Sequence, residues 1–299
     1  MAFKDLRAFI DTLERQGELR RIQAEVDPEL EITEITDRIS KANGPALLFE
    51  NVKGSAYPVL INSMGSYKRM STALGVSELD EIGEEIIELM DVSSYAGLVN
   101  KVKALPRLLN LAGVFPRRIT KAPCQEVVER EPDLDTLPIL KCWPEDGGRF
   151  ITLPLVITKD PITKQQNMGM YRMHVYDGQT TGMHWHLHKD GRENYLRYKE
   201  MGEPMPVAVA LGADPATIYA ATAPLPKEID ELLLAGFLRK QGVETVKCIT
   251  PDLEVPAHAE FVLEGYVDLN ETRLEGPFGD HTGYYSLQDE YPVFHLTCI

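Results

Sequence analysis

The stretch from residue 116 to residue 148 constrains the fold most, because prolines recur through it at intervals too short for a regular helix. A proline inside a helix lacks a backbone donor and clashes with the preceding turn. The stretch is also rich in charge, and the hydrophobic pattern changes across it. We therefore expect a connector or wrapping arm over 116–148 between two domains. Its prolines are Pro116, Pro123, Pro132, Pro138 and Pro144.

Residues 1–115 show the pattern of an α/β domain. Apolar residues recur at helical spacing from Phe3 to Leu13, and Gly17 follows as a stop. Short apolar runs between such segments are typical of buried strands, and alternating helices and strands indicate an α/β architecture. The expected helices cover 3–13, 32–39, 78–90 and 95–111, and the expected strands cover 46–49 and 58–61.

Residues 149–299 change to runs typical of β-strands. We expect a mainly β domain here, a barrel with inserted helices. The final run, 291–299, is apolar and strand-like and lacks a polar tail, so we expect the chain to be truncated before a further domain. The expected strands cover 151–158, 169–176, 182–188, 206–211, 244–249 and 260–269, with a helix around 228–239.

Charge and cysteine usage exclude several classes of protein. The formal net charge is −15, which repels a phosphate backbone or an anionic membrane over most of the surface. No apolar run approaches the roughly 18 residues of a membrane span. The cysteines are scattered without a C-x-x-C pair, which favours a reducing compartment, so we expect a cytoplasmic protein that binds no nucleic acid. They are Cys124, Cys142, Cys248 and Cys298.

Three histidines alternate in the run His-Trp-His-Leu-His, at His184, His186 and His188. On a strand, residues two apart face the same side, so all three rings could project into one cavity. Metal or cofactor contact is one interpretation, and a barrel-lining cluster without a metal is the other. A zinc site with three imidazole ligands is a further, weaker alternative.

Two further segments carry candidate chemistry. Asn167 offers an oxygen ligand, Gly169 permits close backbone approach, and Arg172 could hold a carboxylate through a bidentate fork. Glu275 and Asp280 flank a Gly-Pro-Phe-Gly turn, which fixes two carboxyl groups relative to each other and suits acid and base catalysis. For Asp280 to donate a proton near neutral pH its proton affinity must be raised, and Glu275 is the neighbouring carboxylate expected to raise it. Each has an ordinary structural alternative: a turn asparagine, an ion-paired arginine, or two solvated acids.

Together these segments resemble the UbiD family, which comprises the 3-polyprenyl-4-hydroxybenzoate carboxy-lyases and related decarboxylases of unsaturated and aromatic acids. The resemblance spans almost the whole chain, and Glu-Gly-Pro-Phe-Gly-Asp at 275–280 is its most specific signature. Further matching segments are Asp5-Leu-Arg-Ala-Phe-Ile, Val26-Asp-Pro-Glu-Leu-Glu-Ile-Thr-Glu-Ile35 and Gly44-Pro-Ala-Leu-Leu-Phe-Glu-Asn-Val52.

The resemblance implies an N-terminal α/β domain and a central split β-barrel like those of flavin reductases, with oligomerisation supported by a C-terminal domain. It also implies prenylated FMN as cofactor, made by a flavin prenyltransferase, and a divalent metal, typically manganese. Asn167, His188 and Glu231 match the metal ligands, while Arg172, Glu275 and Asp280 match the acid-base trio. The stretches that match cofactor contacts contain Asn167, Met170, Tyr171, Arg172, His184, Trp185, His186, Lys189 and Asp190.

The implied reaction is the non-oxidative, reversible decarboxylation of an aromatic or α,β-unsaturated acid, which needs an electron sink that a cofactor supplies. The ubiquinone-pathway members carry Arg and Leu where this chain has His184 and His186, which puts a large prenylated phenol in doubt as the substrate. Two rival functions remain, a catalytically inactive flavin-binding or assembly subunit and a split-barrel flavin reductase. No G-x-G-x-x-G follows a strand to bind a dinucleotide, which counts against the reductase.

Overall fold

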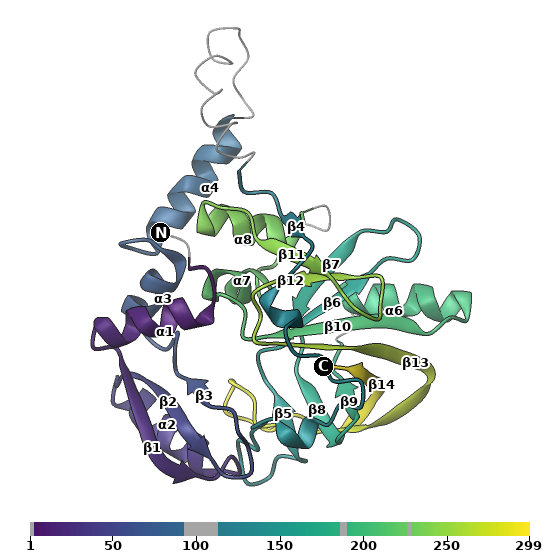
Figure 1. Cartoon of the computed structure of the whole chain (residues 1–299), viewed down its shortest axis with the longest axis horizontal. Coiled ribbons are helices and arrows are strands. Elements are labelled where there is room, and N and C mark those ends of the chain that lie inside the picture. The colour runs from purple at the N-terminus through teal and green to yellow at the C-terminus, as the bar shows by residue number, and fades with distance from the viewer. Residues whose placement is uncertain (1–2, 93–112, 186–189, 226–228) are drawn as a thin grey trace, which may run out of the picture.

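A computed structural model describes residues 3–92, 113–185, 190–225 and 229–299 (Figure 1). Helices and short strands alternate in its N-terminal part, as the sequence predicts. The expected helix at 95–111 lies outside the described residues. The elements of this part are α1 (Leu6–Arg15), β1 (Leu19–Val26), α2 (Glu31–Lys41), β2 (Ala46–Val52), β3 (Val59–Ile61), α3 (Tyr67–Leu74) and α4 (Asp80–Val92).

The first sheet has the order β1-β2-β3, with β1 parallel and β3 antiparallel to β2. Successive side chains of a strand point to opposite faces. Ala46 and Leu48 therefore pack with Phe9 of α1, and Leu47 and Phe49 pack on the opposite face in the cluster that contains Ile32 of α2. This alternation on β2 gives the small sheet a helix on each face.

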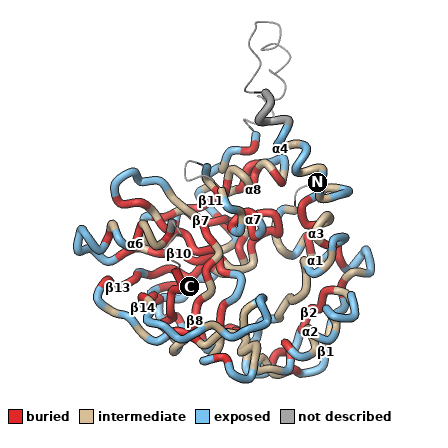
Figure 2. Tube along the Cα trace, turned by 180° about the vertical axis from the view of Figure 1, so that it is seen from behind, coloured by how far each residue is buried: buried red, intermediate tan, exposed pale blue. Residues whose placement is uncertain are grey.

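The second sheet is larger and antiparallel, with the order β5-β8-β9-β14-β13-β10-β6-β7. Its cores hold most of the buried apolar side chains of the chain, and Figure 2 shows buried segments concentrated on these strands and on α7 (Pro215–Ala220). The strands are β5 (Arg149–Ile151), β6 (Leu155–Lys159), β7 (Gln166–Met170), β8 (Met173–Asp177), β9 (Thr180–Met183), β10 (Met205–Leu211), β13 (Phe261–Glu275) and β14 (Asp289–Cys298).

This sheet is curled, as its connectivity requires. Strands β7 and β8 are joined only by Tyr171 and Arg172, yet they stand at places eight and two in the strand order. In a flat sheet six strand spacings separate them by roughly 29 Å. The short connection from Met170 to Met173 spans at most about 11 Å. The sheet must therefore bend back on itself into a curled half-barrel. The predicted fold class, an α/β domain followed by a mainly β split-barrel domain, is confirmed.

Strand β4 (Arg117–Ile119), which lies in the proline-rich stretch, joins a third sheet of order β12-β11-β4. The 3₁₀ turns η1 (Pro123–Gln125) and η2 (Leu134–Thr136) also lie there. The other elements are α6 (Asp190–Met201), α8 (Glu231–Arg239), β11 (Glu244–Lys247) and β12 (Glu254–Pro256). No helix in the described ranges is long and apolar enough to cross a bilayer.

Several elements differ from the sequence expectation. The run 151–158 is divided into β5 and β6 around Pro154, which cannot donate to a ladder, and 169–176 is divided into β7 and β8. The strand expected over 182–188 ends at Met183. Strand β1 and helices α3, α6 and α7 were not predicted individually. Strand β1 is largely exposed between its buried ends, so it shows no clear alternation of apolar and polar residues.

Candidate active site

Arg172, His184 and Glu275 form one buried ionic network at the ends of neighbouring strands. Arg172 precedes β8, His184 follows β9 and Glu275 ends β13, so the antiparallel sheet brings them together. Arg172 donates from Nε to Glu275 Oε1 at 2.8 Å and from Nη2 to Oε2 at 3.0 Å. His184 Nδ1 lies 3.1 Å from Oε2, and the His184 ring stacks on Tyr291 with centroids 4.3 Å apart.

The Glu275 carboxyl is fully buried, yet it remains ionised. Burial alone raises its pKa, but the hydrogen bonds from His184 and Arg172 and the charge of Arg172 outweigh burial and lower the pKa to about 2. The bidentate geometry is the strong form of a carboxylate–guanidinium contact. At neutral pH this carboxylate is therefore a fixed negative charge that orients Arg172.

The loop from Glu275 to Asp280 carries both predicted acids. Its Phe278 ring lies under the guanidinium of Arg172, with 4.8 Å between the guanidinium carbon and the ring centroid. Ser286 Oγ accepts from Arg172 Nη2 at 3.0 Å and from the Phe278 amide at 3.1 Å. Ser286 thus joins the loop to the arginine, so the position of the loop depends on the ionic network.

Asp280 differs from Glu275 in its surroundings, because its side chain is 35% exposed and its Oδ1 accepts from both the backbone N–H and the ring Nδ1 of His281. Burial raises the pKa of Asp280, but these hydrogen bonds and the nearby charges of His281 and Arg172 lower it below its ordinary value overall. The sequence argument expected Glu275 to raise this proton affinity. That expectation is wrong for this structure, since the closest partner of Asp280 is a histidine.

Asn167 and Glu231 form a second group, on β7 and at the first residue of α8. Asn167 Nδ2 donates to Glu231 Oε1 at 2.7 Å, and the Met168 amide donates to Oε2 at 3.0 Å. Asn167 Oδ1 is buried and has no hydrogen-bond partner in the described chain. An unpaired amide oxygen beside a buried carboxylate fits a hard divalent cation. His188, the third predicted ligand, lies outside the described residues.

The metal alternatives for the histidine run stay predictions. His186, His188 and Lys189 lie outside the described residues, and so does the side chain of Asp190. Within the described ranges no three His, Cys, Asp or Glu side chains are arranged to hold a metal. The strand that was expected to align the three histidines stops before His184, so their placement on one strand face has no support from the described backbone.

The remaining predicted residues lie near the two groups. The ring of Tyr171 is buried and fills the space beside Gly169, whose Cβ would lie 2.5 Å from that ring. Gly169 is therefore required by Tyr171 packing, whereas the sequence suggested approach of a ligand. Met170 is half-buried on β7. Trp185 is buried, and its Nε1 has no hydrogen-bond partner in the part of the chain described here.

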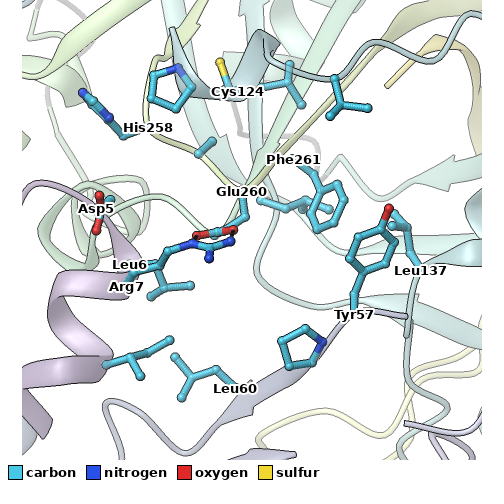
Figure 3. Close-up of a pocket in the computed structure, with 18 of the residues that line it drawn as sticks. Asp5, Leu6, Arg7, Tyr57, Leu60, Cys124, Leu137, His258, Glu260 and Phe261 are labelled. Atoms are coloured by element: carbon cyan, nitrogen blue, oxygen red, sulfur yellow. Dashed lines mark hydrogen bonds and ion pairs between the residues drawn. The ribbon is translucent and has the colours of Figure 1, made fainter. Parts of the chain in front are cut away.

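A large cavity of about 1110 Å³ lies elsewhere, beside α1 (Figure 3). Tyr57, Phe261 and the Arg7–Glu260 ion pair line it. None of the predicted site residues that the structure describes lines this cavity. The size of this cavity is therefore no evidence that it belongs to the candidate site. The carboxyl group with the strongly lowered pKa, Glu275, lies in the ionic network.

Sequence reasoning missed three residues that contact the Glu275–Asp280 loop or the network. Ser286 bonds Arg172, His174 Nδ1 accepts from the Gly276 amide at 3.3 Å, and Asp146 Oδ1 accepts from the Gly279 amide at 2.7 Å. Their partners are distant in the sequence, so no local pattern marks them.

Residues 117–299 match the sequence model of the 3-octaprenyl-4-hydroxybenzoate carboxy-lyase Rift-related domain, and residues 10–90 match the N-terminal domain of the same carboxy-lyase. The chain belongs to the UbiD family. It is 52% identical over 300 residues to an uncharacterised protein of Archaeoglobus fulgidus, covering 100% of this chain and 62% of that relative. An uncharacterised protein of Aquifex aeolicus is 47% identical over 301 residues, which cover 99% of this chain and 62% of that relative.

Solved structures of UbiD-class enzymes share the fold. The evolved dimeric form of HmfF from Pelotomaculum thermopropionicum, in complex with prFMN, superposes with a TM-score of 0.84 at 30% identity, covering 99% of this chain and 64% of that one. The closed form of vanillic acid decarboxylase from Sedimentibacter hydroxybenzoicus superposes with a TM-score of 0.86 at 28% identity. The superposition covers 100% of this chain and 62% of that one. This UbiD chain thus spans about three fifths of the length of these relatives, 62% for the curated ones.

Proposed function

We propose that the protein catalyses the non-oxidative, reversible decarboxylation of an aromatic or α,β-unsaturated carboxylic acid with prenylated FMN. The observation that carries this proposal is the buried Arg172–Glu275 pair beside Asp280 in a member of the UbiD family. Among similar structures, HmfF is solved with prFMN, and another neighbour is a vanillic acid decarboxylase. Prenylated FMN supplies the electron sink that loss of CO₂ from an unsaturated carbon requires.

Arg172 is suited to bind the carboxylate of the substrate. Its Nε and Nη2 donate to Glu275 and Ser286, and the contacts of the described chain leave the two N–H groups of Nη1 for a ligand. Because Glu275 is fully buried and ionised, it holds the guanidinium in one orientation before substrate arrives. Such pre-organised positioning lowers the entropic cost of reaching the transition state.

Asp280 is the better proton donor of the two acids. Glu275 has a pKa of about 2 and keeps no proton at neutral pH. Asp280 is partly exposed, so a bound aromatic ring would exclude water from it and raise its pKa from the lowered value in the free protein. Asp280 would then protonate the carbon that has lost CO₂, while Glu275 stays ionised.

Asn167 and Glu231, with His188, are proposed to hold a divalent cation, manganese in preference to zinc, that binds the cofactor phosphate. The unpaired Asn167 Oδ1 and the buried Glu231 carboxylate support this assignment. Oxygen donors joined by one imidazole suit manganese better than a site of three imidazoles does. Trp185, with an unpaired buried Nε1, is proposed to line the flavin site.

The complete protein, co-produced with a flavin prenyltransferase, would test the proposal. We expect a bound flavin with the mass and absorption spectrum of prenylated FMN, CO₂ release from members of a panel of aromatic and unsaturated acids, and deuterium incorporation into the product. A flavin-binding protein that releases no CO₂ from any acid would support the inactive-subunit alternative. Oxidation of NAD(P)H with bound unmodified FMN would instead indicate a flavin reductase.

A further inference from the structure

We infer that Asp146 is a positioning residue for the proposed site, a buried carboxylate that holds the Glu275–Asp280 loop against the body of the protein. This inference rests on the proposed function, because it assigns the anchor of the proposed proton donor. Asp146 lies at the end of the proline-rich stretch, and its hydrogen bond to the Gly279 amide joins residues that are 133 positions apart in the sequence.

The Asp146 side chain is buried, and its two oxygens bond two segments. Oδ1 accepts from the Gly279 amide at 2.7 Å, and Oδ2 accepts from the Trp143 amide at 2.9 Å. Its contacts within the described chain show no cationic partner, so these backbone N–H groups compensate its burial. Burying a carboxylate without an arginine or lysine beside it costs free energy. Here the buried carboxylate makes one hydrogen bond to the loop, at the Gly279 amide.

The two segments also approach too closely for side chains. The Gly147 amide donates to the Pro277 carbonyl at 2.8 Å, and a Cβ on Gly147 would lie 2.1 Å from the Gly276 carbonyl oxygen. A Cβ on Gly279 would lie 2.2 Å from the Trp143 ring. These distances leave no room for alanine at either glycine without a shift, so segment 143–147 and the loop form one packed unit.

His174 supports the same loop from β8. Its Nδ1 accepts from the Gly276 amide at 3.3 Å, and its ring stacks on Phe150 with centroids 4.4 Å apart. Burial lowers the pKa of His174 more than the nearby carboxylates of Glu275 and Asp146 raise it, so the neutral ring can accept this bond. His174 thus fixes the beginning of the loop, and Asp146 fixes its end.

The end of the loop matters because Gly279 directly precedes Asp280. Glu275 is held by Arg172, whereas the Asp280 amide bonds only to Tyr284 within the same hairpin among the described backbone contacts. The Asp146 bond therefore joins the residue next to the proposed proton donor to segment 143–147, outside this hairpin. A displacement of about 1 Å at a reacting group can lower a rate by roughly 10².

The test compares Asp146→Ala and Asp146→Asn with Asp5→Ala as a matched control. Asp5 Oδ1 also accepts a backbone N–H, from Ala8 at 2.9 Å, but it lies at the start of α1. Two measurements are made. The first is hydrogen–deuterium exchange of the backbone amides of Gly276 and of residues 278–280 in the cofactor-free protein. The second is kcat and KM of the cofactor-loaded protein on an acid that the wild type decarboxylates.

We expect Asp146→Ala to accelerate exchange at Gly279 by about tenfold or more and to lower kcat by roughly 10–100-fold, with KM and flavin content changed less than about threefold. Asp146→Asn keeps one acceptor oxygen, so its exchange rate and kcat should lie between those of the wild type and Asp146→Ala. Asp5→Ala should change neither the exchange rate at Gly279 nor kcat. Faster exchange with wild-type kcat would overturn the inference, as would unchanged exchange. If the wild type decarboxylates no acid, the proposed function fails, and the exchange data still show whether Asp146 anchors the loop.

Discussion

Replacing Glu275 with glutamine keeps the shape of the side chain and removes its charge. Arg172, which is 11% exposed, then keeps its positive charge beside a neutral amide. The carboxyl pKa is lowered from 4.5 to about 2, a difference of 2.5 pH units. At about 1.36 kcal/mol per unit, the native surroundings favour the charged form by about 3 kcal/mol. This value agrees with the usual cost of removing one member of a buried ion pair, about 3–5 kcal/mol.

The predicted loss of stability depends on pH in a defined direction. Because the folded pKa lies below the unfolded value, the Glu275 carboxylate stabilises the fold above pH 4.5, and this contribution is lost as the pH falls towards 2. We therefore expect Glu275→Gln to lower the free energy of unfolding by about 3 kcal/mol at pH 7. The difference from the wild type should narrow by about 1 kcal/mol by pH 3.5.

Urea denaturation at pH 7, 4.5 and 3.5 would measure this difference. Glu264→Gln is the control, since Glu264 is equally a buried glutamate but accepts from the neutral groups of Ile249 and Thr250. Its loss leaves no buried arginine unpaired. A Glu275→Gln variant less than about 1 kcal/mol below the wild type at pH 7, or a difference that does not change with pH, would refute the reasoning.

Three further predictions concern the same region. Asp280→Asn should lower turnover by roughly 10²–10⁴ while flavin binding persists, measured by steady-state CO₂ release and flavin absorbance; unchanged turnover would exclude Asp280 as the acid. Asn167→Ala should reduce the amounts of bound manganese and flavin, measured by metal analysis and by absorbance after gel filtration. Zinc that stays bound in this variant would contradict the proposed ligands. Gly279→Ala should destabilise the fold by about 1–3 kcal/mol in urea, because its Cβ meets the Trp143 ring, and an equally stable variant would show that the ring moves aside.

Much of the architecture was accessible from local patterns. Apolar spacing predicted α1 and α2, and the apolar run in β2 predicted a buried strand, because periodicity reports which face a residue buries. The exposed strand β1 gave no such signal, since only its two ends are buried. The strand breaks at Pro154 and at Arg172 were also missed, because the runs 151–158 and 169–176 each look like one continuous strand in the sequence.

The sequence alone determined the family resemblance, the fold class and the residue types of the candidate site, because these depend on composition and local order. Only the tertiary structure decided which groups meet. Arg172 and Glu275 are 103 residues apart and pair because β8, β9, β14 and β13 are neighbours in the curled sheet. The pKa values follow from those contacts: Glu275 meets an arginine, Asp280 meets His281, and Asp146 reaches the loop from the proline-rich stretch. Hydrogen bonds act over a few ångströms in space, and strand order determines which distant residues come within that distance.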